Sequence, residues 1–161
     1  MAAGDDAPFA RAPEPEDLAR VCRALNDTGA RYVLIGGFAM IAHGAGRFTK
    51  DIDFLIDDAP ENVARVREGL SVLVDNAAAE VADDDVRIHT VVRVVDEIIV
   101  DLMGNACGLS FADVVPDAET HHVLGVPVPV ASAAALIRTK RTFRPQDAMD
   151  RAYLEGLTRG E

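Results

Sequence analysis

The sequence predicts a single mixed α/β (α+β) domain, with a small central sheet flanked by helices. Its 161 residues suit one domain, and 49% of them are hydrophobic, which is enough for a real core. Helix-like and strand-like patterns alternate along the first half of the chain. Later, pairs of apolar runs separated by tight turns predict hairpins, so we expect a mixed rather than an all-parallel sheet.

The N-terminal part divides into a tail and a first helix. Residues 1–13 are small, polar and Pro-containing, and we expect them to form a flexible tail in front of one domain over 14–161. Apolar residues at helical spacing then predict a helix over about 15–28, which ends at Gly29. The spaced residues are Leu18, Val21, Cys22 and Leu25.

Two strands and a helix are expected next. Residues 32–35 predict a short apolar strand that ends at the pair Gly36-Gly37, and a helix is expected over 38–44. After a polar loop, residues 51–56 predict a second strand, in which the two faces alternate strictly.

The middle of the chain is predicted to begin with a helix that Asp58 caps and that has Pro60 in its first turn. Residues 72–74 predict a short strand. Two stronger β runs, 86–95 and 98–102, are then expected to pair as a hairpin.

The C-terminal third is expected to contain one more hairpin and two helices. The hairpin turns at Gly125. Ser132 is expected to cap a helix that runs to about Arg141, and Pro145 is expected to begin the last helix.

Composition excludes some function classes. The net charge of −11 argues against general affinity for nucleic acids or anionic membranes, because phosphate binding needs an excess of Lys and Arg. The two cysteines, Cys22 and Cys107, show no metal or redox spacing, so we expect a reduced, cytoplasmic location. No signal peptide and no apolar segment of membrane length is evident in the sequence.

The strand over 51–56 carries an unusual pair of carboxylates. Asp51 and Asp53 share one face, because residues two apart on a strand point the same way. Two bare carboxylates about 4–5 Å apart repel by roughly 3–4 kcal/mol at an effective dielectric constant near 20. The fold tolerates this pair if a cation lies between the two groups or if one of them is protonated.

A third carboxylate and the glycine pair point to the same chemistry. Asp101 lies in a neighbouring β run and is a candidate third ligand for Mg²⁺, which prefers carboxylate and phosphate oxygens. Three carboxylates on one sheet face would suit a two-metal site for phosphoryl chemistry. Gly36-Gly37 offers backbone N–H groups at a helix start, where phosphate binds readily, although two glycines also suit a tight strand-to-helix turn.

These residues resemble a known signature. The pair Gly36-Gly37, followed after thirteen residues by Asp51-x-Asp53, is similar to the hG[GS]…Dh[DE]h signature of nucleotidyltransferases of the DNA polymerase β-like superfamily. The preceding Arg47-x-Thr49 extends the match to R-x-T-x-D-x-D, which recurs in small bacterial members of that superfamily.

The C-terminal segment resembles a more particular group. LIRTKRTFRPQDAMDRAYL is similar to the closing K…R-P-K-D-x-x-D-x-x-x-L segment of nucleotidyltransferases related to the AbiEii toxin of abortive-infection and toxin–antitoxin systems. One position departs from it, since Gln146 stands where that group commonly has Lys. The residues on its polar positions are Lys140, Arg144, Asp147 and Asp150.

The resemblance implies a minimal nucleotidyltransferase fold and a reaction. A nucleoside monophosphate (NMP) would pass from a nucleoside triphosphate (NTP) to an acceptor hydroxyl, and pyrophosphate would leave. Asp51 and Asp53 would bind two Mg²⁺ ions, or Mn²⁺, while Asp101 would hold one ion and help to deprotonate the acceptor. The implied nucleotide-binding residues are Gly36, Gly37, Arg47, Thr49, Lys140 and Asp147.

Several questions stay open at this stage. The acceptor could be a small molecule, a tRNA end or a protein side chain, and a cognate antitoxin is a possible partner. A catalytically silent nucleotide- or partner-binding module of the same fold is the main alternative. A glycosyltransferase with an Asp-x-Asp motif would usually be longer, and a haloacid-dehalogenase phosphatase would need a different sequence after its aspartates.

Other polar residues receive plainer interpretations. His43 is interpreted as a cap at the end of a helix, and His121 and His122 have no cysteine or carboxylate at ligand spacing. Three basic residues share one face of the predicted 86–95 strand, which we interpret as an exposed sheet face rather than an acceptor-facing strip. They are Arg87, His89 and Arg93.

Overall fold

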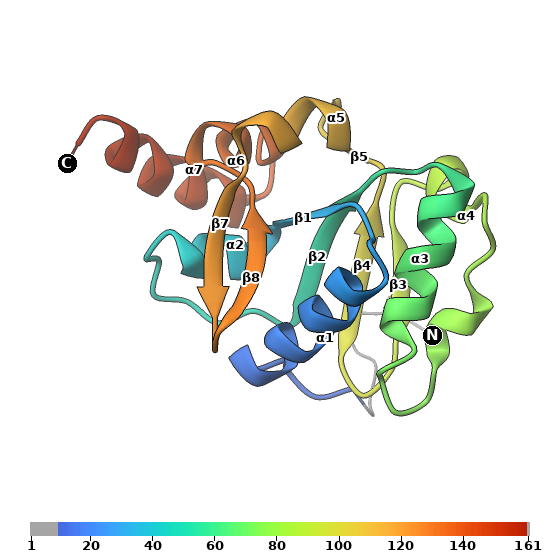
Figure 1. Cartoon of the computed structure of the whole chain (residues 1–161). Helices are drawn as coiled ribbons and strands as arrows, with labels where there is room; N and C mark the ends of the chain where they lie inside the picture. The colour runs from blue at the N-terminus through green and yellow to red at the C-terminus, as the bar shows by residue number, and fades with distance from the viewer. Residues whose placement is uncertain (1–9, 161) are drawn as a thin grey trace.

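The computed structural model describes residues 10–160, which form a mixed six-stranded sheet with helices on both faces and a separate two-stranded sheet (Figure 1). The strands are β1 (Tyr32–Ile35), β2 (Asp51–Ile56), β3 (Val92–Val95), β4 (Ile99–Met103), β5 (Asn105–Ala106), β6 (Leu109–Ser110), β7 (Glu119–Val123) and β8 (Val126–Val130). The helices are α1 (Pro15–Asp27), α2 (Gly36–Ala42), α3 (Pro60–Leu70), α4 (Asp85–Ile88), α5 (Phe111–Val114), α6 (Ala133–Thr139) and α7 (Pro145–Thr158). Two 3-10 turns lie at Ala77–Glu80 and Val115–Asp117.

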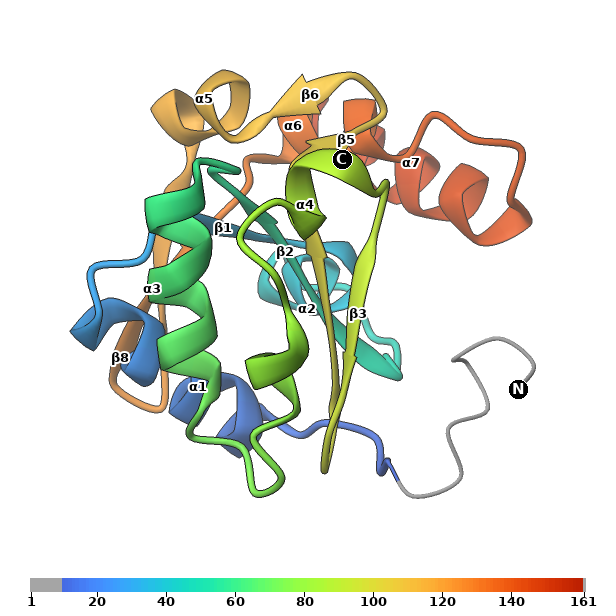
Figure 2. The same cartoon turned by 90° about the vertical axis from the view of Figure 1, so that its right-hand side faces the viewer.

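The main sheet, within the described residues, has six strands in the order β3-β4-β2-β1-β8-β7. Strands β2 and β4 are parallel, whereas β1–β2, β3–β4 and β7–β8 are antiparallel pairs. Helices α1 and α3 cover one face, and α2 and α7 lie on the other side (Figures 1 and 2). The predicted fold class is therefore confirmed.

The core is centred on β1 and β2. All four residues of β1 are buried, and the ring of Tyr32 packs edge-on against Phe54 at a centroid distance of 5.2 Å. Cys22 on α1 is fully buried, as its place on an apolar stripe predicts, and burial raises the pKa of its thiol to about 12. Because both faces of the central strands are covered, any charged group there needs a local partner.

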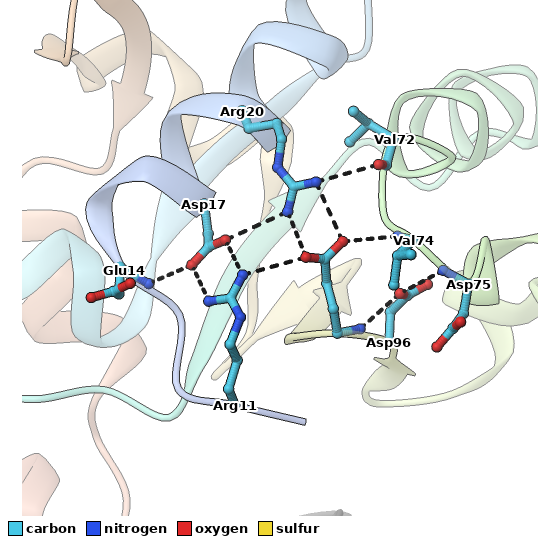
Figure 3. A network of polar contacts seen from close by, with 9 residues as sticks. Arg11, Glu14, Asp17, Arg20, Val72, Val74, Asp75 and Asp96 are labelled. Atoms are coloured by element: carbon cyan, nitrogen blue, oxygen red, sulfur yellow. Dashed lines mark hydrogen bonds and ion pairs between the residues drawn. The ribbon is translucent and has the colours of Figure 1, made fainter. Parts of the chain in front are cut away.

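An ion-pair network fastens α1 to the β3–β4 turn (Figure 3). Arg11 donates two hydrogen bonds of 2.7 Å to Asp17, and Arg20 lies 3.0 Å from Glu97. Asp96, next in the chain to Glu97, accepts hydrogen bonds from the backbone N–H groups of residues 75, 77 and 97. The turn that leads into β4 is therefore held from several directions.

Arg11 belongs to the predicted tail but contacts the domain. Its backbone N–H donates to the carbonyl of Glu97 at 3.0 Å, so contacts with the domain begin before residue 14. Residues 1–9 of the predicted tail lie outside the described residues. The division of the chain at residue 13 stays a prediction.

Most predicted elements are found, including both hairpin turns, the Ser132 cap and the last helix that begins at Pro145. The predicted strand over 86–95 is wrong in its first half, where residues 85–88 form α4 and only 92–95 form β3. On a strand Val86 and Ile88 would share one face, but Val86 is buried and Ile88 is exposed. The alternation of apolar and polar residues in this segment therefore does not mark a sheet face. Arg87 and His89 therefore do not share a strand face with Arg93.

Two smaller expectations are also wrong. Residues 72–74 form a turn rather than a strand, since Val72 and Val74 are exposed and only Leu73 is buried. Asp58 does not cap α3, because the cap position is Ala59 and it is Asp57 that accepts the Ala59 N–H at 3.0 Å. Helix α2 begins at Gly36, two residues before the predicted start.

Candidate active site

The glycine pair brings the start of α2 against two polar side chains. Gly36 has φ +72°, and a Cβ built on it would lie 2.0 Å from Oδ2 of Asp53. A Cβ on Gly37 would lie 2.6 Å from Oγ1 of Thr49, which itself donates to the Asp51 carbonyl at 2.9 Å. Glycine is needed at both positions because no other residue leaves room for these contacts.

Three carboxylates meet on one face of the sheet. Asp51 and Asp53 alternate along β2, and the parallel register pairs Asp53 with Asp101 of β4. One oxygen of each of the three lies within 4.8 Å of the others. The sequence-based expectation that these residues converge is thus met by the geometry.

Arg93 of β3 completes this cluster, whereas the sequence analysis interpreted it as part of an exposed sheet face. It is the antiparallel partner of Asp101, to which it donates two hydrogen bonds of 2.8 Å from Nε and Nη2. Its Nη2 also lies 3.1 Å from Asp51. The true register of the β3–β4 hairpin would have revealed it, but the over-long predicted strand assigned Arg93 to an exposed face.

Burial and mutual repulsion act on the β2 carboxylates. Burial raises the pKa of Asp53 well above its ordinary value, and the charges of Asp51 and Asp101 raise it further, against a lowering contribution from Lys140. Burial also raises the pKa of Asp51, and Asp101 adds to this while Arg93 opposes it. Without a bound cation, ionisation of these carboxylates therefore lowers the stability of the folded state.

The facing side of the site is built by the C-terminal helices. Lys140 is buried and its Nζ lies 3.0 Å from Asp150 and 3.9 Å from Asp147. Arg47 from the loop before β2 and Gln146 both donate to Asp150, at 2.5 and 2.8 Å. Burial alone would raise the pKa of Asp150, but the hydrogen bond of Gln146 and the charges of Lys140 and Arg47 hold it below its ordinary value.

The loop between α6 and α7 adds a hydroxyl and a further cation. Thr142 donates to Asp147 at 2.5 Å and accepts from the backbone N–H of Arg144. The Arg144 side chain is 75% exposed, with Nε 3.7 Å from Asp147, and is therefore free to turn toward a ligand. Thr142 had no sequence signal, because its role depends on how the loop folds back.

A single cleft of about 820 Å³ connects the two sides. Every residue proposed from the sequence for catalysis, metal binding or nucleotide binding lines it. They are Gly36, Gly37, Arg47, Thr49, Asp51, Asp53, Asp101, Lys140 and Asp147. Among the residues not predicted, Arg93 and Thr142 line it too.

The donor atoms fit a hard divalent cation. The three carboxylates offer only oxygen, which Mg²⁺ and Mn²⁺ prefer, and no His or Cys is among the residues that line the cleft. The raised pKa values of Asp51 and Asp53 mark the local deficit of positive charge that such an ion would fill. Arg93 supplies only part of that charge.

The family comparison decides the general chemistry. A family model described as "Nucleotidyl transferase AbiEii toxin, Type IV TA system" matches residues 18–140, which is more than half of the chain. The chain belongs to the AbiEii nucleotidyltransferase toxin family. Among curated protein sequences, none matches the chain.

A solved structure shares the fold of this AbiEii-family chain. It is the crystal structure of a presumed nucleotidyltransferase from Thermotoga maritima, with a TM-score of 0.57 and 16% identity. The similarity covers 94% of this chain and 98% of that one. At this identity the likeness shows the fold alone, and it agrees with the minimal nucleotidyltransferase fold expected from the sequence.

Membership of the AbiEii family supports nucleotidyl transfer as the general activity. Within the part of the chain that the structure describes, no helix has both the length and the apolar character needed to cross a bilayer.

Proposed function

We propose that this chain is a metal-dependent nucleotidyltransferase that moves an NMP from an NTP to an acceptor hydroxyl. The observation that carries the proposal is the meeting of Asp51, Asp53 and Asp101 in a cleft whose other side presents Lys140 and Arg144. Carboxylates on one side and cations on the other suit a ligand that carries metal ions and phosphate groups.

The carboxylates would hold two Mg²⁺ ions, Asp51 and Asp53 contributing to both and Asp101 to one. When bound, the ions neutralise triphosphate charge and lower the pKa of the acceptor hydroxyl. Asp101 would take the proton of the acceptor hydroxyl while the hydroxyl oxygen attacks the α-phosphorus of the NTP. The bond from that phosphorus to the β-phosphate oxygen then breaks, and pyrophosphate leaves with the bonding electrons.

The neighbouring residues would hold the triphosphate. The backbone N–H groups of Gly36 and Gly37 at the start of α2, together with Thr49, suit phosphate oxygens. Lys140 would contact the triphosphate, and Asp147 and Asp150 would position it, since both lie close to Nζ. Arg47 would act with them, because it is joined to the same Asp150 carboxylate.

The family description also suggests a biological setting. The AbiEii model is named for a toxin of a type IV toxin–antitoxin system. By that analogy, this chain would be the toxin member of such a pair, with a cognate antitoxin and a nucleotide substrate. The acceptor is proposed only as a hydroxyl group, on a small molecule, a tRNA end or a protein side chain.

Label transfer from each of the four α-³²P-labelled NTPs with Mg²⁺ tests the activity. The acceptors offered are total tRNA, the protein itself and a panel of polyhydroxylated small molecules. Wild type should transfer label, and Asp53→Asn should lower the rate at least about a hundredfold because metal binding is lost. Asp117→Asn, an exposed aspartate outside the cleft, is the matched control and should behave as wild type.

One observation favours a second function, a nucleotide-binding module without catalysis. Arg93 already pairs with both oxygens of Asp101, so the carboxylates have an internal cation. If the protein binds NTP but transfers no label to any acceptor, with either Mn²⁺ or Mg²⁺, the chain is a binding module and not a transferase. If label transfer requires Asp53, the module is ruled out.

A further inference from the structure

A second group of ligand-type side chains lies outside the cleft. His43 follows the last turn of α2, and Glu119 and His121 lie on β7, the edge strand of the sheet. One ligand atom from each of the three lies within 4.8 Å of the others. We propose that these residues form a transition-metal site of the Zn²⁺ class, separate from the Mg²⁺ chemistry of the cleft.

The fold brings the three together from distant parts of the sequence. Alternation along β7 puts Glu119 and His121 on one face and His122 on the other. The rings of His43 and His121 meet edge to face, with centroids 5.6 Å apart. The expectation that His121 has no carboxylate at ligand spacing is wrong, because Glu119 lies two residues earlier on β7 and shares its strand face. The contact with His43 depends on the fold, since that residue is far away in the sequence.

His43 is oriented as metal-binding histidines usually are. Its Nε2 lies 2.9 Å from the carbonyl oxygen of Ala131, and a carbonyl can only accept, so Nε2 carries the proton. The lone pair is then left on Nδ1, where a metal can take it. Such a hydrogen bond from the second ring nitrogen to a carbonyl fixes the tautomer and the ring plane. The hydroxyl of Tyr153 also holds the His43 backbone carbonyl, at 2.9 Å.

The distance between the β7 ligands suits a metal ion. Nε2 of His121 and Oε1 of Glu119 are 3.2 Å apart. Two ligands bound to Zn²⁺ at about 2.0–2.1 Å with tetrahedral angles lie roughly 3.3 Å from one another. An ion can therefore replace the hydrogen that these two atoms share, and a ring nitrogen of His43 lies within 4.8 Å of both.

The ligand set selects the kind of metal. Two imidazoles and one carboxylate suit Zn²⁺ or Co²⁺, whereas the all-carboxylate cluster in the cleft suits Mg²⁺. The carboxylate is exposed and both rings are half-buried, so water can complete the coordination. Because His43 ends the helix that begins at Gly36, a bound metal would fasten that helix to the edge of the sheet.

Cobalt spectroscopy tests the site in the whole chain after chelator treatment. Co²⁺ at a low-coordinate His₂Glu site gives strong visible absorption, whereas an octahedral oxygen site gives little. We expect wild type, His122→Ala and Asp53→Asn to develop the same band, and Zn²⁺ to displace it. His121→Ala and Glu119→Gln should lose the band and at least tenfold in Zn²⁺ affinity by calorimetry.

His122→Ala is the matched control, since it removes a histidine from the opposite face of the same strand. Zn²⁺ should raise the melting temperature of wild type and of His122→Ala but not of His121→Ala. The proposal is overturned if wild type shows no band, or if His121→Ala binds Co²⁺ and Zn²⁺ as wild type does. An equal loss in His122→Ala would overturn it as well. Asp53→Asn separates this site from the proposed transferase site. This variant should fail in label transfer and should still develop the cobalt band.

Discussion

Arg93 and Asp101 form a two-point ion pair across the β3–β4 ladder, with both hydrogen bonds at 2.8 Å. The same guanidinium reaches Asp51 at 3.1 Å. The oxygens that would bind a divalent ion are therefore the ones that the arginine holds. A metal ion and Arg93 must compete for them, so the side chain has to move or share these oxygens when metal binds.

Arg93→Met should bind Mn²⁺ more tightly than wild type in the absence of nucleotide. We expect roughly a tenfold gain, the equivalent of one lost charge-assisted hydrogen bond. The metal-free variant should also melt at a lower temperature, because Asp51 and Asp101 lose this ion-pair partner. Manganese electron paramagnetic resonance measures the affinity. Arg87→Met, which removes an exposed arginine 3.8 Å from Asp58, is the control, and equal affinities in all three proteins would refute the competition.

Gly36→Ala should abolish metal binding in the cleft, and Gly29→Ala should not. Both glycines have φ +72°, so alanine costs about 1–2 kcal/mol at either one. Only at Gly36 does the new Cβ meet Asp53, at 2.0 Å, whereas nothing lies within 4 Å of it at Gly29. Chemical denaturation of the two variants measures the backbone strain that both share. Mn²⁺ titration measures the steric effect on Asp53, which only Gly36→Ala should show. Similar metal binding in both would show that Asp53 moves aside freely.

Asp53→Asn should stabilise the metal-free protein at neutral pH. Because burial and the neighbouring carboxylates raise the pKa of Asp53, the native state binds a proton that the unfolded state releases. Stability is then lost as pH rises from the ordinary carboxyl pKa near 4 through the raised one, and asparagine avoids this loss. Repulsion from one neighbouring carboxylate, about 3–4 kcal/mol at an effective dielectric constant near 20, gives the scale of the electrostatic part of this effect.

Urea denaturation at pH 4.5 and pH 7.5 measures this effect. The stabilisation by Asp53→Asn should be largest at pH 7.5 and should shrink at pH 4.5, because the raised pKa of Asp53 makes the native carboxyl increasingly protonated as pH falls. Added Mg²⁺ should also reduce it, by stabilising only the wild type. A difference that grows toward low pH would contradict the assigned shift.

Lys140→Met should raise KM for the NTP at least about tenfold, the loss expected for one charged hydrogen bond to phosphate. The methionine keeps the apolar stem, and Asp150 keeps its contacts with Arg47 and Gln146, so the fold should survive. Steady-state kinetics of label transfer, with Lys50→Met as an exposed control, checks the role. An unchanged KM would assign Lys140 to structure alone.

Short-range patterns predicted one half of the candidate site well. Strict alternation over 51–56 placed Asp51 and Asp53 on a common face, and the glycine pair marked the close approach to them. Neither depends on distant parts of the chain. The basic side came from resemblance, since a lysine and an aspartate at the ends of two helices have no periodic pattern that joins them.

Long-range pairing set the limit of prediction. The place of Asp101 beside Asp53 depends on a parallel register between strands almost fifty residues apart, and no local pattern specifies it. Arg93 was assigned to the wrong environment because alternation was followed through a segment that folds as α4. The geometry brings the predicted residues together, while their catalytic roles stay predictions.

The register of β4 has a further consequence for how this protein tolerates change. Four of its five residues are buried, and a shift by one residue would move Asp101 to the opposite face, away from Arg93 and Asp53. What resists slippage is the turn before it, where Asp96 ties together three backbone N–H groups. Selection on the proposed active site would then also act on Asp96, which lies outside it. Substitution of Asp96 would disturb the proposed site even though Asp51, Asp53 and Asp101 were all retained.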